Sequence, residues 1–295
     1  MQTGLIGQLA AGIKDGNIKT WQPKDKFSFH CTLCGRCCTN NEIVVDTYDI
    51  LNLRRALGLT TREMFDRQLL ELGWSMPNGN VMCRIKFHQV AEDIAACPFL
   101  KSLPEARGPQ TVDRPVGCAV HAARPAVCRG YPFGRVFYYG PDGNLSKEHI
   151  VMVPDVCEEG LTAGKAFGVE QRVEDWIAES QLQPYWDAAT RTPLPIKRLV
   201  EAKIVKEPQR RPPPIRWMSE KSVWRCYMPI YLVDEMPWVA REFPENRRPG
   251  PQRHEEDLKI IDRIRELIDE LSISLRDVAI DGDDELRRYL EDVTR

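Results

Sequence analysis

Four cysteines stand within the eight residues CTLCGRCC, namely Cys31, Cys34, Cys37 and Cys38. Thiolates two residues apart on a tight turn can reach one metal ion or one face of a metal cluster. The spacing C-x2-C-x2-C is the one by which three cysteines bind a 4Fe-4S cluster. Gly35 suits a turn that requires a positive φ. The spacing therefore predicts a metal site, and it favours iron.

The neighbouring pair Cys37 and Cys38 needs a separate explanation. In an extended backbone two adjacent side chains point to opposite sides. One of the pair is therefore predicted to serve a second metal site. The alternative is a single site, in which one thiol binds metal while its neighbour packs against the site or stays reactive.

Later segments supply further thiols, in CPFL, in GCAVHAARPAVCRGYPF and in DVCEEG. Together with the first cluster they give eight thiols, enough for two four-cysteine sites. Four thiolates suit either a closed zinc site or an iron-sulfur cluster, so the ligand type alone leaves both open. We expect a 4Fe-4S cluster as the cofactor, with zinc as the alternative. The predicted metal ligands are Cys31, Cys34, Cys37, Cys38, Cys97, Cys118, Cys128 and Cys157.

The N-terminal stretch MQTGLIGQLAAGIKDG lacks a basic leader, and Gly, Gln and Lys interrupt its apolar residues. It fits neither a signal peptide nor a membrane span, so we expect a cytoplasmic protein. In a reducing compartment clustered thiols are metal ligands or redox groups more often than disulfides. The 41 basic and 43 acidic residues nearly balance, which gives no electrostatic footprint for nucleic acid.

The cysteine pattern resembles a known family. CTLCGRCC at 31–38, CPFL at 97–100 and CAVHAARPAVCRGYP at 118–132 are similar to the YkgJ-type CxxCxxCC cysteine-cluster family. Its members are described as zinc- or iron-chelating proteins, and its relatives include the flagellin lysine N-methylase. The resemblance covers about 31–165, under half of the chain. It implies a metal centre, with an enzyme activity known for some relatives only.

Two arginines flank one of the later cysteines, Arg124 and Arg129 on either side of Cys128. Their guanidinium groups are predicted to offset the negative charge of a thiolate cluster and to hydrogen-bond its sulfur atoms. The alternative is an ordinary role in loop ion pairs. For His121 we expect a supporting or packing role, because the cysteines already suffice as ligands.

Two cysteines fall outside the predicted ligand set. Cys83 in VMCRIKF and Cys226 in VWRCYMPI stand in apolar, strand-like runs, where a buried free thiol behaves as a small hydrophobic residue. The adjacent acids Glu158 and Glu159 are typical of a solvated surface turn.

The elements around these residues follow from local signals. Residues 41–73 predict a short strand and two helices, with Asp46 or Thr47 and then Thr60 or Thr61 as N-caps. RVFYYG, the turn PDGN and HIVMV predict a hairpin. GVEQRVEDWIAESQLQPYWDAA predicts an amphipathic helix that a proline interrupts. We expect an α+β protein, an irregular Cys-rich domain organised by metal with flanking helices and a helical C-terminal extension.

A Pro-rich stretch, KEPQRRPPPIRW, gives the clearest domain boundary. The predicted division is a cysteine-cluster domain at 1–190, a linker at 191–217 and a C-terminal extension at 218–295. In the extension HEEDLKIIDRIRELIDELSI has one apolar stripe, which predicts a helix docked on the main body or on a partner.

Two functions remain open from the sequence. The first is an iron-sulfur protein in electron transfer or in protein modification such as methyl transfer, as an oxidoreductase or a methyltransferase-like enzyme. The second is a zinc-stabilised module for protein-protein contact without catalysis. Both imply a protein partner or substrate. Phosphate-loop, serine-elbow and dinucleotide motifs are absent from the sequence.

Overall fold

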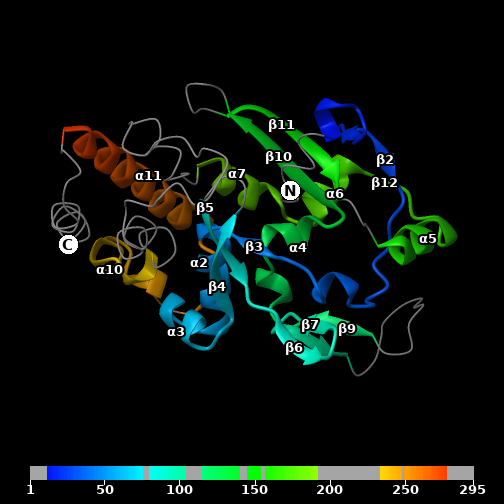
Figure 1. Ribbon diagram of the computed structural model, residues 1–295, viewed down its shortest axis with the longest axis horizontal. Helices are drawn as coiled ribbons and strands as arrows, with labels where there is room; N and C mark the ends of the chain where they lie inside the picture. The colour runs from blue at the N-terminus through cyan, green and yellow to red at the C-terminus, as the bar shows by residue number, and fades with distance from the viewer. Residues whose placement is uncertain are drawn as a thin grey trace.

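Small antiparallel sheets and helices make up the described part of the protein, as the computed structural model in Figure 1 shows. The structure describes residues 12–75, 80–103, 115–139, 145–153, 157–191, 233–247 and 249–277. The arrangement confirms the predicted α+β class with a helical C-terminal part.

All strand pairs within the sheets are antiparallel. One three-stranded sheet has the order β1 (Thr20–Trp21), β11 (Leu145–Met152), β10 (Phe133–Tyr139). The other has the order β3 (Val44–Val45), β5 (Asn80–Ile85), β4 (Leu70–Ser75). Three two-stranded pairs are β12 (Gln171–Arg172) with β2 (Lys26–Phe27), β6 (His88–Ala91) with β7 (Ile94–Ala96), and β8 (Leu100–Ser102) with β9 (Val116–Cys118).

The helices are spread along the described chain. The α-helices are α2 (Thr47–Leu57), α3 (Thr61–Asp66), α4 (Ala126–Gly130), α5 (Glu158–Ala166), α6 (Val173–Glu179), α7 (Gln183–Arg191), α10 (Pro237–Glu242) and α11 (His254–Asp277). The short 3-10 helices are η1 (Arg36–Cys38), η2 (His121–Ala123), η3 (Val233–Glu235) and η4 (Pro244–Arg247).

The predicted strand and two helices are confirmed as β3, α2 and α3. Asp46 caps α2 and Thr60 caps α3, and each forms a reciprocal capping box with the acid three residues later. Gly58 ends α2 in the left-handed region, with a φ of 66°, which glycine adopts without steric cost.

The predicted hairpin is confirmed as β10 and β11, with Phe133 opposite Met152. The predicted interrupted helix is also confirmed, as α6 followed by α7. The break lies at 180–182, where Gln181 has a φ of 53°. Pro184 stands in the first turn of α7, where its missing N–H costs no intrahelical hydrogen bond. The proline therefore marks the start of the second helix.

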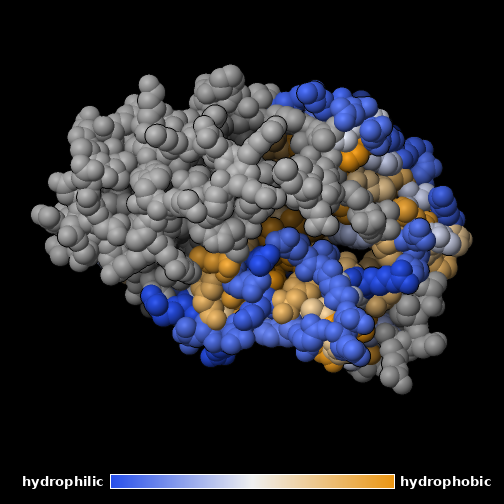
Figure 2. All heavy atoms as spheres, in the orientation of Figure 1, coloured by the Kyte–Doolittle hydropathy of each residue, from blue (hydrophilic) through white to orange (hydrophobic). Residues whose placement is uncertain are grey.

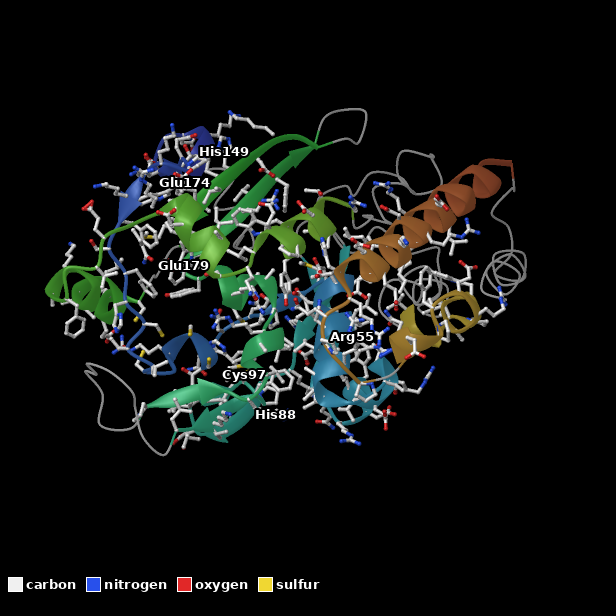
Figure 3. The ribbon with its side chains drawn as sticks, turned by 180° about the vertical axis from the view of Figure 1, so that it is seen from behind. Arg55, His88, Cys97, His149, Glu174 and Glu179 are labelled. Atoms are coloured by element: carbon white, nitrogen blue, oxygen red, sulfur yellow. The ribbon has the colours of Figure 1, made fainter. Side chains whose placement is uncertain are left out.

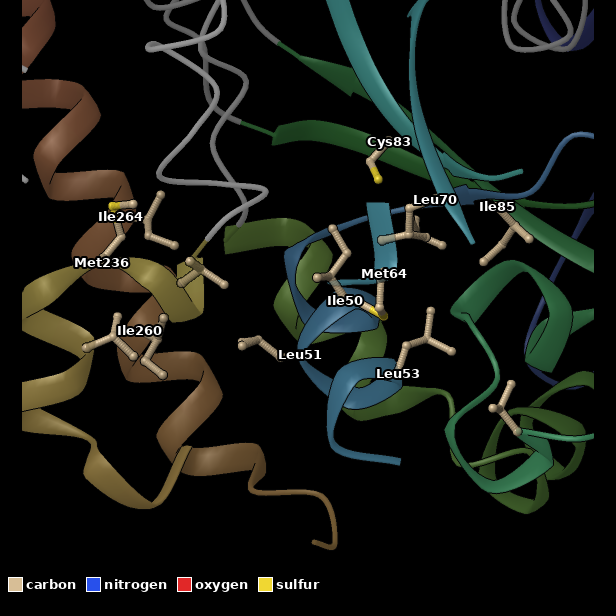
Figure 4. Packing of buried hydrophobic residues seen from close by; sticks show 14 of the residues in the cluster. Ile50, Leu51, Leu53, Met64, Leu70, Cys83, Ile85, Met236, Ile260 and Ile264 are labelled. Atoms are coloured by element: carbon tan, nitrogen blue, oxygen red, sulfur yellow. The ribbon is translucent and has the colours of Figure 1, made fainter. Parts of the chain in front are cut away.

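The largest hydrophobic cluster is built around α2. Ile50, Leu51 and Leu53 are fully buried and lie between the β3–β5–β4 sheet and the C-terminal segment 233–277. Figure 4 shows Ile260 and Ile264 of α11 on the side of this cluster that the C-terminal segment forms. The C-terminal helix thus docks on the main body, one of its two predicted locations. Residues 192–232, with most of the predicted linker and Cys226, lie outside the described residues, and the domain boundaries stay a prediction.

Buried charges also join α2 to the C-terminal segment. Arg55 donates from Nη1 to Asp257 Oδ1 of α11 over 2.8 Å, and its Nη2 bonds the second carboxylate oxygen. Arg54 bonds the carbonyl of Asn246 and lies 3.5 Å from Asp234 Oδ2. All four of these charged side chains are almost completely buried. Figure 3 shows Arg55 where α2 meets this segment.

Candidate metal centre

The loop that carries the first four cysteines turns twice through the left-handed region. Leu33 has a φ of 58° and Gly35 a φ of 80°, which confirms the positive φ expected of the glycine. A Cβ on Gly35 would also come within 2.6 Å of Val116 Cγ2, so the position has no room for a side chain. These turns lead directly into η1, which contains Cys37 and Cys38.

The two neighbouring thiols lie side by side. Their Sγ atoms are 3.9 Å apart, because η1 is a tight helical turn and not an extended strand. The expectation that Cys37 and Cys38 point to opposite sides of an extended backbone is therefore wrong. The 3-10 turn places both thiols on the same side of the chain, whereas an extended strand would place adjacent side chains on opposite sides.

Backbone hydrogen bonds attach the next cysteine to η1. The amide of Cys97 donates to the carbonyl of Cys38 over 2.9 Å. The Asn40 side chain bonds the carbonyl of Asp93 at 2.8 Å and the amide of Ala95 at 2.7 Å, which fixes the β6–β7 hairpin against the loop. Figure 3 shows Cys97 at the end of this hairpin. Register in a second pair places Cys118 of β9 opposite Leu100 of β8.

Cys128 lies in α4, and Figure 1 shows η1 between α4, α5 and the strands β6 to β9. The N-cap of α4 is Pro125, whose side chain accepts no hydrogen bond. Asp49 of α2, which is 77 residues away in the sequence, supplies the cap instead. Its carboxylate Oδ1 accepts a hydrogen bond from the amide of Ala126 over 2.9 Å. The start of α4 is thereby held by α2.

Close packing of α5 brings the last cysteine to the loop. A Cβ on Gly164 would come within 2.5 Å of the Phe29 backbone nitrogen, and Gly160 meets the Phe29 ring equally closely. The amide of His30 also donates to the Gly160 carbonyl over 2.9 Å. Only glycine permits such a close approach, which places the start of α5 beside the cysteine loop.

Cys157 is the N-cap of α5, and its Sγ accepts from the amide of Gly160 at 3.3 Å. Burial raises the pKa of Cys157 to about 11, and the nearby Cys34 thiol raises it further by its charge and a hydrogen bond. The carboxylate of Glu159 lies 3.5 Å from the Cys157 sulfur and pairs with Arg36 at 2.6 Å. Arg36 stands between Cys34 and Cys37, so this ion pair joins α5 to the loop.

Cys37 raises the pKa of several of the remaining thiols. A hydrogen bond with Cys38 and burial raise the pKa of Cys37 itself. Burial is the main cause of a raised pKa in four further thiols, and the charge of Cys37 adds to it in each: Cys31, Cys97, Cys118 and Cys128. Each of the eight predicted ligands thus lies near at least one other, with Cys38 beside Cys37 and Cys157 joined to the rest through Cys34, and their role as ligands stays a prediction.

The donor atoms do not yet converge on one point. Among the described residues, no three His, Cys, Asp or Glu side chains are arranged to hold a single ion. Thiols are the preferred ligands of zinc and of iron-sulfur clusters, and their number and mutual proximity fit such a group. Binding would require inward rotation of the thiols and loss of their protons.

The two arginines beside Cys128 differ in placement. Burial lowers the pKa of the half-buried Arg124, whereas the negative charges of Cys128, Cys118 and Cys31 raise it. It also contacts the exposed His121 through Nη1. Arg129 is buried and donates to the Ser180 carbonyl at 3.1 Å and to the Tyr185 hydroxyl at 3.2 Å, besides the carbonyl of Ala122. Arg124 faces the thiols, whereas Arg129 ties α4 to α7.

Cys83 lies in the hydrophobic core, as predicted for a structural thiol. It is completely buried in β5, and burial raises its pKa far above the usual value. It belongs to the core cluster that also contains Ile50 and Met64.

Three residues near the thiols escaped the sequence prediction. Asp49 looked like an ordinary helix position, and Glu159 like part of a solvated turn. Tyr131 accepts from the amide of Cys157 at 2.6 Å through its hydroxyl, and burial raises its pKa. For Tyr131 and Glu159 a signal existed, namely their closeness in sequence to Cys128 and Cys157. For Asp49 no local signal exists.

Comparison with family models matches this part of the chain. Residues 30–158 match the CxxCxxCC family. This family is described as a "Putative zinc- or iron-chelating domain", and the match contains the eight predicted ligands. The predicted resemblance is confirmed over these residues.

No curated protein and no solved structure matches the chain. In the described ranges, the helices are too short or too polar to cross a membrane.

Proposed function

We propose that the CxxCxxCC domain of this protein binds an iron-sulfur centre, a 4Fe-4S cluster, through its gathered thiols. The observation that carries the proposal is the group around Cys37, whose thiols come from several separate segments. These thiols lie close enough to raise one another's pKa. A bound cation removes this repulsion, because thiolates bind metal in place of protons. The bound cluster would supply a one-electron redox centre.

The effects of the thiols on one another's pKa suggest how the eight cysteines divide into two sets of four ligands. Cys97, Cys118 and Cys128 are proposed to form a first four-thiolate set with Cys37, whose charge acts on all three. Cys31, Cys34 and Cys157 are proposed as the basis of a second set, because Cys34 acts on both of the others, and Cys38 is assigned to this set as the eighth thiol. Arg124 is proposed to offset the negative charge of the thiolates, a role common for groups around all-thiolate sites.

One observation favours zinc as the second candidate. In a tetrahedral site with Zn–S bonds of about 2.3 Å, two sulfur atoms are about 3.8 Å apart. The measured separation of 3.9 Å between the Cys37 and Cys38 sulfurs fits one edge of such a tetrahedron. Each cysteine of a 4Fe-4S cluster instead binds a different iron, which keeps the sulfurs farther apart. In this case the centre would stabilise a binding module without chemistry of its own.

A protein partner or substrate is proposed for either centre. Among the residues that the structure describes, the large hydrophobic side chains with exposed fractions of 42% to 64% are Val90, Ile94, Val127 and Phe167. They stand on the β6–β7 hairpin, on α4 and at the end of α5, and these elements carry or adjoin cysteines. On the face in Figure 2 the described surface shows both hydrophilic and hydrophobic residues. Electron transfer and modification of the partner, such as methyl transfer, remain the proposed activities of an iron-sulfur centre.

Metal analysis with a visible spectrum tests the proposal. Protein purified without oxygen is expected to contain iron and acid-labile sulfide and to absorb in the visible range. Cys128→Ser should lose most of both, because an alcohol binds these metals poorly. Cys83→Ser is the matched control, since its thiol lies in the core, and it should keep the spectrum. Stoichiometric zinc without sulfide would replace the first candidate with the second.

A further inference from the structure

We propose that Asp49 is the positioning residue that holds Cys128 in the metal centre. This inference rests on the proposed function, in which Cys128 is a ligand. It assigns to a side chain of α2, outside the cysteine segments, a part in forming the centre.

The first step is the weakness of α4 on its own. The helix has five residues and begins after Pro125, which offers no side-chain cap. Helix starts leave amides without intrahelical partners, and these need an acceptor from elsewhere. Asp49 Oδ1 accepts from the first of them, Ala126, at 2.9 Å across a separation of 77 residues. Cys128 follows two residues later.

The second step is the rigidity of the carboxylate itself. Its other oxygen, Oδ2, accepts from the amide of Asp46 at 3.2 Å, and Asp46 Oδ1 accepts from the amide of Asp49 at 2.9 Å. The Asp49 residue is only 2% exposed. Both oxygens are therefore engaged, and one carboxylate ties the start of α2 to the start of α4.

The third step is that α2 is itself held firmly in place, so that it can fix the position of α4. Its apolar face lies in the largest core cluster, and Arg54 and Arg55 anchor its last turn to the C-terminal segment. Arg129 holds α4 from the other side by its bonds to Ser180 and Tyr185. Between these two attachments, the place of Cys128 is set by elements that carry no ligand. Such outer groups orient the ligands of a metal site.

The fourth step separates two properties of the Asp49 side chain, its acceptor oxygen and its ionisable carboxyl group. An Asp49→Asn variant keeps an acceptor for the Ala126 amide but removes the ionisable group. An Asp49→Ala variant removes both. The two variants together distinguish positioning from charge.

The test compares Asp49→Ala, Asp49→Asn and the control Asp46→Ala in the full-length protein. Asp46→Ala breaks the same capping box of α2 but removes no bond to α4. The first readout is hydrogen exchange of the Ala126 amide in metal-free protein. The second is affinity for Zn²⁺ and Fe²⁺, measured against a competing chelator.

Asp49→Ala is expected to exchange the Ala126 amide at least about tenfold faster, because that amide loses its acceptor. Its metal affinity should fall by about 10- to 100-fold, the usual effect of losing an outer-shell partner. Asp49→Asn should restore most of the protection, and Asp46→Ala should leave both quantities close to those of the parent.

Equal exchange and equal affinity in Asp49→Ala and Asp46→Ala would overturn the inference. An Asp49→Asn variant as defective as Asp49→Ala, with an unprotected Ala126 amide, would also count against positioning. A parent that binds neither metal would refute the proposed function instead. The exchange measurement needs no metal, so it tests whether Asp49 holds α4 in place whether or not the parent binds metal.

Discussion

Removing Asp257 should strongly destabilise the protein, because it leaves the positive charge of Arg55 buried without its main partner. The pair is bidentate, with one N–O distance of 2.8 Å, and the side chains of Arg55 and Asp257 are 1% and 0% exposed. The second acceptor for Arg55 is Asn52 Oδ1 at 3.3 Å, a neutral amide that cannot offset the charge. Asn246 also loses its acceptor at 3.1 Å.

The expected magnitude follows from the cost of breaking one side of a buried ion pair, about 3–5 kcal/mol. For a chain of this size that corresponds to a fall in Tm of about 6–20 °C. Burial raises the pKa of Asp257 while Arg55 lowers it, so desolvation of the carboxylate already opposes the pair. Replacing both partners by apolar residues, Arg55→Met with Asp257→Leu, should therefore recover a large part of the loss.

Urea unfolding of Asp257→Ala, of the double variant and of a control measures these differences. Glu170→Ala is a suitable control, because Glu170 pairs with Lys26 at the same 2.8 Å but with both side chains more than half exposed. Its effect should be far smaller, since exposed pairs contribute little. An Asp257→Ala variant no less stable than Glu170→Ala would refute the view that buried charges hold the C-terminal helix to α2.

Two further predictions concern other parts of the fold. Burial raises the pKa of Asp46 to about 6, so the native protein keeps a proton that the unfolded chain loses. The contribution of Asp46 to the free energy of unfolding should fall as pH rises from about 4 to 6, and Asp46→Asn should make the pH slope in urea titrations shallower over this range; an unchanged slope would contradict the assignment. Gly164→Ala should destabilise the protein by about 1–3 kcal/mol, because its Cβ would meet the Phe29 backbone at 2.5 Å. Gly250→Ala, with open space around its Cβ, is the control, and equal melting temperatures would show that α5 does not pack so closely.

Local signals in the sequence predicted the local structure well. Asp46 and Thr60 were among the residues expected as N-caps, and the hairpin and the proline-interrupted helix were found where their patterns stand. Such features depend on residues three or four positions apart, so a single sequence contains the whole signal. The positive φ of Gly35 was predictable for the same reason.

Long-range contacts were beyond reach from one sequence. Nothing near Asp49 reveals that its acceptor function serves Ala126, and nothing near Arg55 reveals Asp257, 202 residues away. The conformation of Cys37 and Cys38 was missed because the prediction assumed an extended backbone, whereas the positive φ of Gly35 leads into a 3-10 turn. The assignment of the eight cysteines as ligands stays a prediction, which rests on residue type and spacing.

The most direct test of the account is the amount of iron, acid-labile sulfide and zinc per chain in protein purified without oxygen. It should be measured for the parent and for Cys37→Ser, Cys128→Ser and Cys83→Ser. The account predicts iron and sulfide in the parent and in Cys83→Ser, with large losses in Cys37→Ser, whose thiol is central to the group, and in Cys128→Ser. A parent free of iron and zinc, or full metal content in both of the latter variants, would contradict it.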